Sequence, residues 1–143
     1  RLVEWPARFQ RLRADVILDG AHNLDAARVL AGTWREQFPN QKATIVFGAV
    51  AGKDVSAVLH ELGPLAAEWH FTHFDSPRAM TAEELQSILG ISDVPVFCHA
   101  DLAAALEATR DASPRLITGS LYLAGEVIAA FSPDHAAYER SWQ

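Results

Sequence analysis

The sequence predicts an α/β domain of three layers, in which helices cover both faces of a mostly parallel sheet of about six strands. Three observations predict this fold class. Short apolar runs alternate along the chain with segments whose apolar residues recur every three or four positions. Several of the short runs are apolar almost throughout, which is typical of strands covered on both faces. Helix-capping residues and turns that contain glycine or proline separate the segments.

The predicted strands are the short apolar runs. They cover residues 15–19, 43–48, 68–73, 94–99 and 115–119, and residues 8–12 are expected to add a short edge strand. The runs at 15–19, 43–48 and 115–119 are the most continuously apolar, so we expect both of their faces to be covered. Strands and helices alternate throughout, which favours parallel pairing with right-handed crossovers.

Helices are predicted between the strands from apolar spacing and from capping residues. Thr81 and Glu84 have the spacing of a capping box, and Gly63 and Pro64 are expected to end the second helix. The expected caps, in chain order, are Asn23, Asp54, Thr81, Asp101 and Ser120.

We expect one folded domain over residues 15–131. Residues 1–14 are expected to be an inter-domain linker that includes the edge strand, and residues 132–143, which show no clear pattern, a C-terminal tail. The length of 143 residues suits a single domain. Because the first residue is Arg, we expect the chain to be part of a longer polypeptide.

Composition speaks against several classes of protein. A net charge of −6 with dispersed basic residues argues against nucleic-acid binding. There is no apolar run of membrane-spanning length and no signal peptide, so no membrane association is expected. Cys98 is the single cysteine, which excludes a disulfide within the chain and indicates the cytoplasm. His70 and His73 are the one histidine pair with ligand-like spacing, but they fall in a predicted strand, so no metal site is expected.

The most informative motif is Asp19-Gly20-Ala21-His22-Asn23, at the junction of a strand and a helix. The small residues would let backbone N–H groups approach a ligand closely. Asp19 would accept hydrogen bonds from a ribose or an ammonium group, and His22 would donate to a phosphate or carboxylate. The alternative is a structural turn in which Asp19 accepts backbone amides and Asn23 only caps the helix. The spacing leaves both interpretations open.

Weaker candidates follow other strands or precede the first main one. Lys53 and Asp54 end a glycine-flanked turn, and Lys53 is either an anion contact or a solvated lysine. Arg78 suits bidentate recognition of a carboxylate, or is an ordinary surface arginine. Ser120 either binds an anion together with the free N–H groups of its helix or only caps that helix. Arg8 either faces a phosphate or is solvated. A parallel sheet would gather several of these residues along one edge.

Five segments together carry a resemblance to a known family. They are Trp5-Pro6-x-Arg8, Asp19-Gly-Ala-His-Asn23, Phe47-Gly48 with Lys53-Asp54, Pro77-Arg78-Ala79 and Thr118-Gly-Ser-Leu-Tyr-Leu123. In this order they resemble the C-terminal domain of the folylpolyglutamate synthase/dihydrofolate synthase family, within the Mur ligase superfamily. The resemblance spans roughly residues 5–128 and implies a Rossmann-like sheet.

The resemblance also implies an ATP-dependent ligase that joins L-glutamate to a folate or dihydropteroate carboxylate through an acyl phosphate. ATP and Mg²⁺ would be held mainly by an N-terminal ATPase domain of the same polypeptide, in a monomeric enzyme. By the same resemblance Arg8 would contact the terminal phosphate and Asp19 the ribose, both as ATP-binding residues. His22 would be catalytic and would line the glutamate pocket with Arg78 and Ser120.

Two residues depart from the family pattern. Leu24 replaces the proline that commonly follows Asn23, and Ala7 replaces the glycine before Arg8 and stiffens the linker. The sequence contains no phosphate-binding loop, so we expect no ligase activity from this chain alone.

Other functions remain open from the sequence. One is the equivalent domain of another Mur-type amino-acid ligase with a different acceptor. Another is a non-catalytic α/β ligand-binding module. A hydrolase that uses Asp19, His22 and Ser120 has little support, because Thr118 and Tyr122 stand where a nucleophile turn has glycines.

Overall fold

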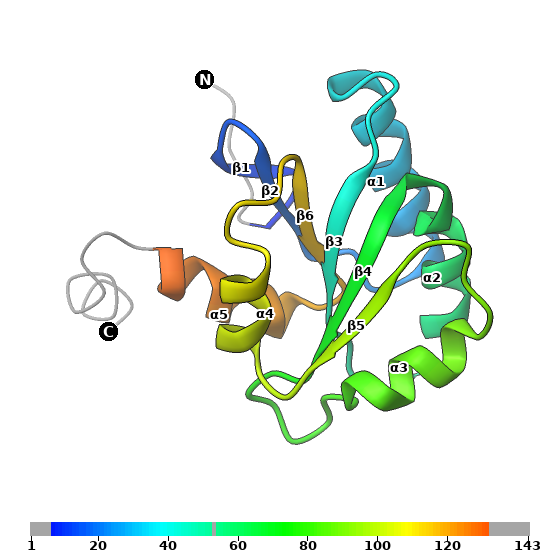
Figure 1. The fold of residues 1–143 in the computed structure, drawn as a ribbon, viewed down its shortest axis with the longest axis vertical. Helices are drawn as coiled ribbons and strands as arrows, with labels where there is room; N and C mark the ends of the chain where they lie inside the picture. The colour runs from blue at the N-terminus through cyan, green and yellow to red at the C-terminus, as the bar shows by residue number, and fades with distance from the viewer. Residues whose placement is uncertain (1–6, 53, 132–143) are drawn as a thin grey trace.

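The computed structural model describes residues 7–52 and 54–131. These residues form one sheet of six strands in the order β1-β2-β6-β3-β4-β5, flanked by five α-helices and the short 3₁₀ helix η1 (Figure 1). In chain order the elements are β1 Gln10–Arg13, β2 Val16–Asp19, α1 Leu24–Gln37, β3 Ala43–Phe47, α2 Val55–Leu62, η1 Gly63–Leu65, β4 Ala66–Thr72, α3 Ala82–Leu89, β5 Val96–His99, α4 Leu102–Ala108, β6 Arg115–Thr118 and α5 Leu121–Phe131.

The sheet is parallel except at one edge. β2, β6, β3, β4 and β5 are parallel neighbours, whereas β1 pairs antiparallel with β2. The predicted mostly parallel sheet of about six strands is therefore confirmed. β1 begins two residues later than expected, because a turn with positive φ at Ala7 and Phe9 precedes it.

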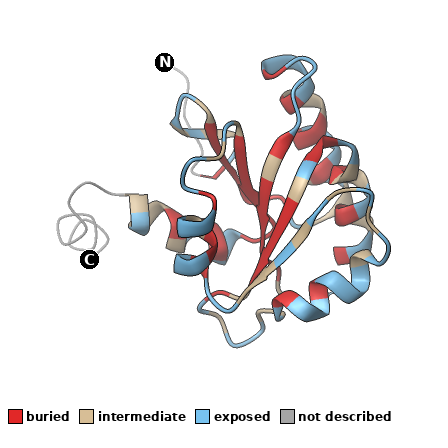
Figure 2. Cartoon of the chain, in the orientation of Figure 1, coloured by how far each residue is buried: buried red, intermediate tan, exposed pale blue. Residues whose placement is uncertain are grey.

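Helices cover both faces of the sheet, which confirms the predicted three layers. One apolar core lies under α1, α2 and α3, and it includes Trp34, Phe47 and Trp69. A second core lies under α4 and α5 and includes Val46, Ile117 and Leu123. The central strands are buried on both faces, as Figure 2 shows for β2 and β6, in agreement with their continuous apolar sequence.

Most helices begin at the capping residue that the sequence indicates. Asn23 and Asp101 each accept a hydrogen bond from a backbone N–H of the first turn, and Thr81 and Glu84 form the expected capping box. Asp54 is an exception: it occupies the N-cap position of α2, but its side chain makes no capping hydrogen bond. The N-terminal N–H groups of α2 thus lack the usual side-chain acceptor.

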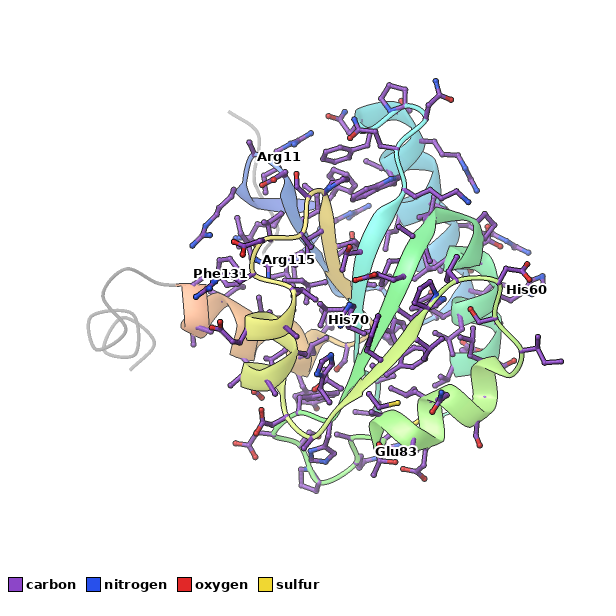
Figure 3. All side chains as sticks on the ribbon, viewed as in Figure 1. Arg11, His60, His70, Glu83, Arg115 and Phe131 are labelled. Carbon is purple, nitrogen blue, oxygen red and sulfur yellow. The ribbon has the colours of Figure 1, made fainter. Side chains whose placement is uncertain are left out.

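The amino ends of the strands carry a buried cation. Arg115, at the start of β6, is 2% exposed and donates to the Leu106 carbonyl and the Thr109 hydroxyl. Its guanidinium also lies 5.5 Å from the ring centre of Phe131 (Figure 3). Burial, more than the charge of nearby Arg13, lowers the pKa of Arg115. These contacts anchor α4 and α5 to the end of the sheet opposite the candidate site.

The connections create a crevice at the other end of the strands. From β2 and β3 the chain passes to α1 and α2 on one face, whereas from β6, which lies between them, it passes to α5 on the other face. In open α/β sheets, ligands bind where neighbouring strands send their connections to opposite faces. Residues 1–6, 53 and 132–143 lie outside the described residues, so the expectations for Trp5, Lys53 and the tail remain predictions.

Candidate functional site

The carboxyl ends of β2, β6 and β3 lie side by side and are packed through glycine. Gly119 has a φ of 122°, and a Cβ added to it would overlap the carbonyl oxygen of Gly48. Gly48 in turn donates to the Thr118 carbonyl at 3.2 Å. A Cβ on Gly20 would overlap the side chain of Leu121. The backbone at this edge is thus closely packed, and the side chains beside it are held at fixed positions.

Asp19 is built into the turn that follows β2. Its Oδ1 accepts from the Ala21 N–H and its Oδ2 from the Phe9 N–H, both at 2.9 Å. Burial raises the pKa of Asp19, while these two amide hydrogen bonds and the charge of Arg8 oppose the rise. In this structure Asp19 therefore makes the contacts of a structural turn, in which its carboxylate accepts backbone amides. Each carboxylate oxygen still has acceptor capacity for a further donor.

His22 is exposed and is held through one ring nitrogen. Its Nδ1 lies 3.1 Å from the Gly20 carbonyl oxygen. A carbonyl only accepts, so Nδ1 carries the hydrogen and the neutral ring has its lone pair on Nε2. Within the described part of the chain, Nε2 has no hydrogen-bond partner.

His22 borders two adjoining cavities. The smaller, of about 170 Å³, lies between His22 and the N-terminus of α2, with Phe47, Asp54, Val58 and Gly119 in its walls. The larger, of about 410 Å³, lies on the other side of His22, against Arg8, Asp19, Val29 and Leu121. The predicted residues Arg8, Asp19, His22 and Asp54 are therefore brought together around two spaces that share one imidazole.

Arg78 lies at the rim of the smaller cavity, and within residues 7–52 and 54–131 its guanidinium has no carboxylate partner. Its Nη2 donates to the Ala51 carbonyl at 3.1 Å, and Ala51 is part of the cavity wall. The Ala51 N–H donates to the Arg78 carbonyl, and Val50 and Ala79 form an antiparallel bridge. The loops after β3 and β4 are thus paired, which places the Arg78 guanidinium beside the cavity.

Ser120 is 2% exposed and caps α5. Its Oγ accepts from the N–H groups of Tyr122 and Leu123 at 3.1 and 3.5 Å, and the residue lines neither cavity. The capping interpretation of Ser120 therefore matches its present contacts. Two residues earlier, the Thr118 hydroxyl is buried and has no hydrogen-bond partner among the described residues. Sequence reasoning missed this hydroxyl, because an unpartnered buried group has no sequence signature.

Sequence reasoning also missed a hydrogen-bonded chain on β4 and β5. His70 Nε2 lies 2.7 Å from a Glu68 carboxylate oxygen, and His70 Nδ1 lies 2.8 Å from His99 Nε2. The two imidazole planes are 9° apart, so the rings meet edge to edge. His70 is 4% exposed and lies on the sheet face that α4 covers (Figure 3). The alternation of Glu68 and His70 on one strand face could have suggested the first contact, but the second requires the β4–β5 register.

Over residues 7–52 and 54–131, no three His, Cys, Asp or Glu side chains are grouped as metal ligands. In the same residues, no helix is both long and apolar enough to span a membrane.

The fold and the position of the cavities together indicate a class of protein domain. A mostly parallel sheet with ligand-sized cavities at the carboxyl ends of its strands is typical of α/β domains that bind small ligands at that edge. Residues 7–121 match the family described as Mur ligase, glutamate ligase domain, and the chain belongs to this family.

The relatives that the chain resembles are folylpolyglutamate and dihydrofolate synthases. A dihydrofolate synthase/folylpolyglutamate synthase of Bacillus subtilis is 32% identical over 86% of this chain and 30% of its own length. Folylpolyglutamate synthase of Mycobacterium tuberculosis, in a structure with ADP and AMPPCP, superposes with a TM-score of 0.82 at 31% identity over 92% of this chain and 33% of its own.

A third similar protein bears on the ligands. It is a bifunctional folylpolyglutamate synthase/dihydrofolate synthase with Mn, AMPPNP and L-glutamate bound, with a TM-score of 0.73 and 29% identity over 89% of this chain and 32% of its own. The present chain thus spans about a third of the length of these relatives. The resemblance to the folylpolyglutamate synthase family that the sequence motifs predicted is confirmed.

Proposed function

We propose that this chain is the glutamate ligase domain of an ATP-dependent ligase that joins L-glutamate to the carboxylate of a folate or of dihydropteroate. One observation carries the proposal: in a chain of this family, two cavities share His22 at the carboxyl edge of the sheet. One cavity would take the nucleotide and the other the amino acid. The acceptor carboxylate and the phosphate that is transferred to it would meet between the two cavities.

The larger cavity suits the nucleotide side. The Asp19 oxygens retain acceptor capacity for ribose hydroxyls, and the exposed Arg8 offers a cation to the terminal phosphate. Val29 and Leu121 give this cavity an apolar wall. Most of the ATP site, and the Mg²⁺ ion that supports phosphoryl transfer by neutralising charge, would belong to an N-terminal ATPase domain of the same polypeptide.

The smaller cavity suits the glutamate. Arg78 at its rim is a fixed cation for a carboxylate, and the N-terminus of α2, without a side-chain cap at Asp54, presents free N–H groups beside the same space. Lys53 would add a second cation. Ser120 borders neither cavity, so its contact with glutamate remains a prediction from the family resemblance.

The proposed chemistry needs positioning rather than a protein nucleophile. The acceptor carboxylate becomes an acyl phosphate at the expense of ATP, and the glutamate amine then displaces phosphate from the acyl carbon. Closure of the two domains on each other would exclude water from the acyl phosphate. We propose that the enzyme is a monomer of the cytoplasm.

ADP release tests the proposal. The polypeptide that carries this chain together with its N-terminal domain should release ADP with glutamate and either dihydropteroate or tetrahydrofolate, whereas the present chain alone should release none. Arg78→Gln should raise the KM for glutamate about tenfold through loss of a charged hydrogen-bond donor. Arg35→Gln, on an exposed turn of α1, should leave it unchanged.

The acceptor arms of the assay distinguish the alternatives. Turnover with one acceptor alone would show which of the two activities the protein has. No turnover with either acceptor, in a folded protein that binds ATP, would overturn the proposed acceptors and favour another Mur-type ligase.

A further inference from the structure

The α-amine of glutamate is protonated at neutral pH and must lose a proton before it can attack an acyl phosphate. If the proposed function is correct, on which this inference rests, the site needs a proton acceptor next to the smaller cavity. Such an acceptor must have a lone pair that no protein hydrogen bond already uses and must be accessible to the substrate.

His22 meets these requirements through its tautomer. The Gly20 carbonyl fixes the hydrogen on Nδ1, which leaves the lone pair of Nε2 without a partner among the described residues. The ring is exposed and borders both cavities, and thus the place where the acyl phosphate and the amine would meet. When Nε2 gains a proton, Nδ1 keeps its hydrogen bond to Gly20, so the ring need not turn.

The other acidic or basic groups in the cavity walls are poorer proton acceptors. Both Asp19 oxygens accept backbone amides, and Asp19 borders only the larger cavity, where the proposed function assigns its remaining acceptor capacity to the ribose. Asp54, at the N-terminus of α2, borders the smaller cavity but, unlike His22, not the larger one. Asp25 pairs with Arg28 on the exposed side of α1. Arg8 is a permanent cation.

We infer that His22 is the general base of the aminolysis step. Nε2 takes one proton from the α-ammonium group as its nitrogen forms a bond to the acyl carbon. The bond between that carbon and the phosphate oxygen then breaks, and the departing phosphate takes the second proton from the nitrogen. The products are the amide, hydrogen phosphate and a His22 imidazolium, which returns its proton to solvent.

Hydroxylamine separates this role from binding or folding. It is unprotonated at neutral pH and traps an acyl phosphate as a hydroxamate without needing a base. In the polypeptide with its N-terminal domain, His22→Asn and His22→Gln should lower the kcat of glutamate transfer about 100- to 10,000-fold at neutral pH. Hydroxamate formation should stay within about twofold of wild type. The deficit in glutamate transfer should shrink as the pH rises toward the pKa of the amine.

His60→Asn is the matched control, because His60 is exposed on α2 and borders neither cavity (Figure 3). Equal losses of glutamate transfer and hydroxamate formation in the His22 variants would overturn the inference, as would a rise in the KM for glutamate with unchanged kcat. Nitrogen-15 spectra of the chain should show the neutral His22 ring protonated on Nδ1, and the opposite tautomer would also overturn it. Wild-type protein that forms neither ADP nor hydroxamate would instead reject the proposed function.

Discussion

Two histidines of this chain lie in opposite kinds of surroundings. His70, in the β4–β5 pair, is buried, and both of its ring nitrogens have protein partners, Glu68 and His99. His22, at the carboxyl ends of β2, β6 and β3, is exposed and borders two cavities, and only one of its ring nitrogens has a partner among the described residues. The first histidine is fully used by the fold, whereas the second retains an unused lone pair.

This difference extends to the regions around them. In the β4–β5 pair, side chains form hydrogen bonds with one another, and the stability of the sheet should depend on these bonds. At the carboxyl edge, the backbone and its glycines hold the shape, and several side-chain groups keep spare hydrogen-bonding capacity. Substitutions at the edge should therefore affect stability strongly when they disturb the backbone and weakly when they remove a side chain.

The largest expected effect comes from the backbone of the edge. Gly119→Ala should destabilise the protein by roughly 3 kcal/mol or more, because the new Cβ would overlap the Gly48 carbonyl and the φ of 122° disfavours alanine. Urea unfolding measures the change. Gly32→Ala is the control: nothing lies within 4 Å of the new Cβ in α1, so stability should rise by up to about 1 kcal/mol. Equal effects at both positions would contradict the crowding at the edge.

The next largest effect is the difference in stability between the same substitution, His to Asn, at His70 and at His22. His70→Asn should cost about 2 kcal/mol in the free energy of unfolding, because asparagine is too short to bond both Glu68 and His99 and leaves a gap in a buried site. His22→Asn should change it by less than about 0.5 kcal/mol, as expected for an exposed side chain. If His22→Asn destabilises as much as His70→Asn, His22 has a structural role that the geometry does not show.

A smaller effect should appear in the pH dependence. Burial lowers the pKa of His99, the charge of His70 lowers it further, and Asp101 opposes both. The unfolded chain binds a proton at this histidine near pH 6.5, and the folded chain only at lower pH. The free energy of unfolding should therefore fall as the pH drops below about 6.5 and level off below the folded pKa. His99→Gln should remove this part of the slope, and an unchanged slope would contradict the assignment.

The sequence predicts the fold well because its signals are local. Apolar runs mark the strands, and the caps at Asn23, Thr81 and Asp101 mark the helix starts that the structure has. The strand order and the Glu68–His70–His99 chain could not be predicted in this way, because they depend on pairings between distant segments.

The site is predicted only in part. The motif that contains Asp19 and His22 indicates which residues gather at the edge, because parallel strands end there together. It does not indicate which lone pairs remain free. The hydrogen bond from the Phe9 amide to the Asp19 carboxylate depends on the turn before β1. The position of Ser120 outside the two cavities of the site depends on the packing of α5.

The smallest expected effect tests the spare capacity of the edge directly. Thr118 and Thr109 are both buried, but the Thr118 hydroxyl has no partner among the described residues, whereas the Thr109 hydroxyl donates to the Ala105 carbonyl and accepts from Arg115. Valine has nearly the same shape as threonine. Thr118→Val should therefore leave the free energy of unfolding unchanged or raise it by up to about 1 kcal/mol, while Thr109→Val should lower it by about 1 to 3 kcal/mol.

Urea unfolding of both valine variants decides between two descriptions of the edge. A neutral or stabilising Thr118→Val means that the fold itself makes no use of this hydroxyl, as the contrast between the two regions requires. If Thr118→Val lowers the free energy of unfolding as much as Thr109→Val does, an ordered water forms a hydrogen bond with the Thr118 hydroxyl in solution. The carboxyl edge would then be as fully hydrogen-bonded as the β4–β5 pair. The distinction between the two regions would in that case rest on His22 alone.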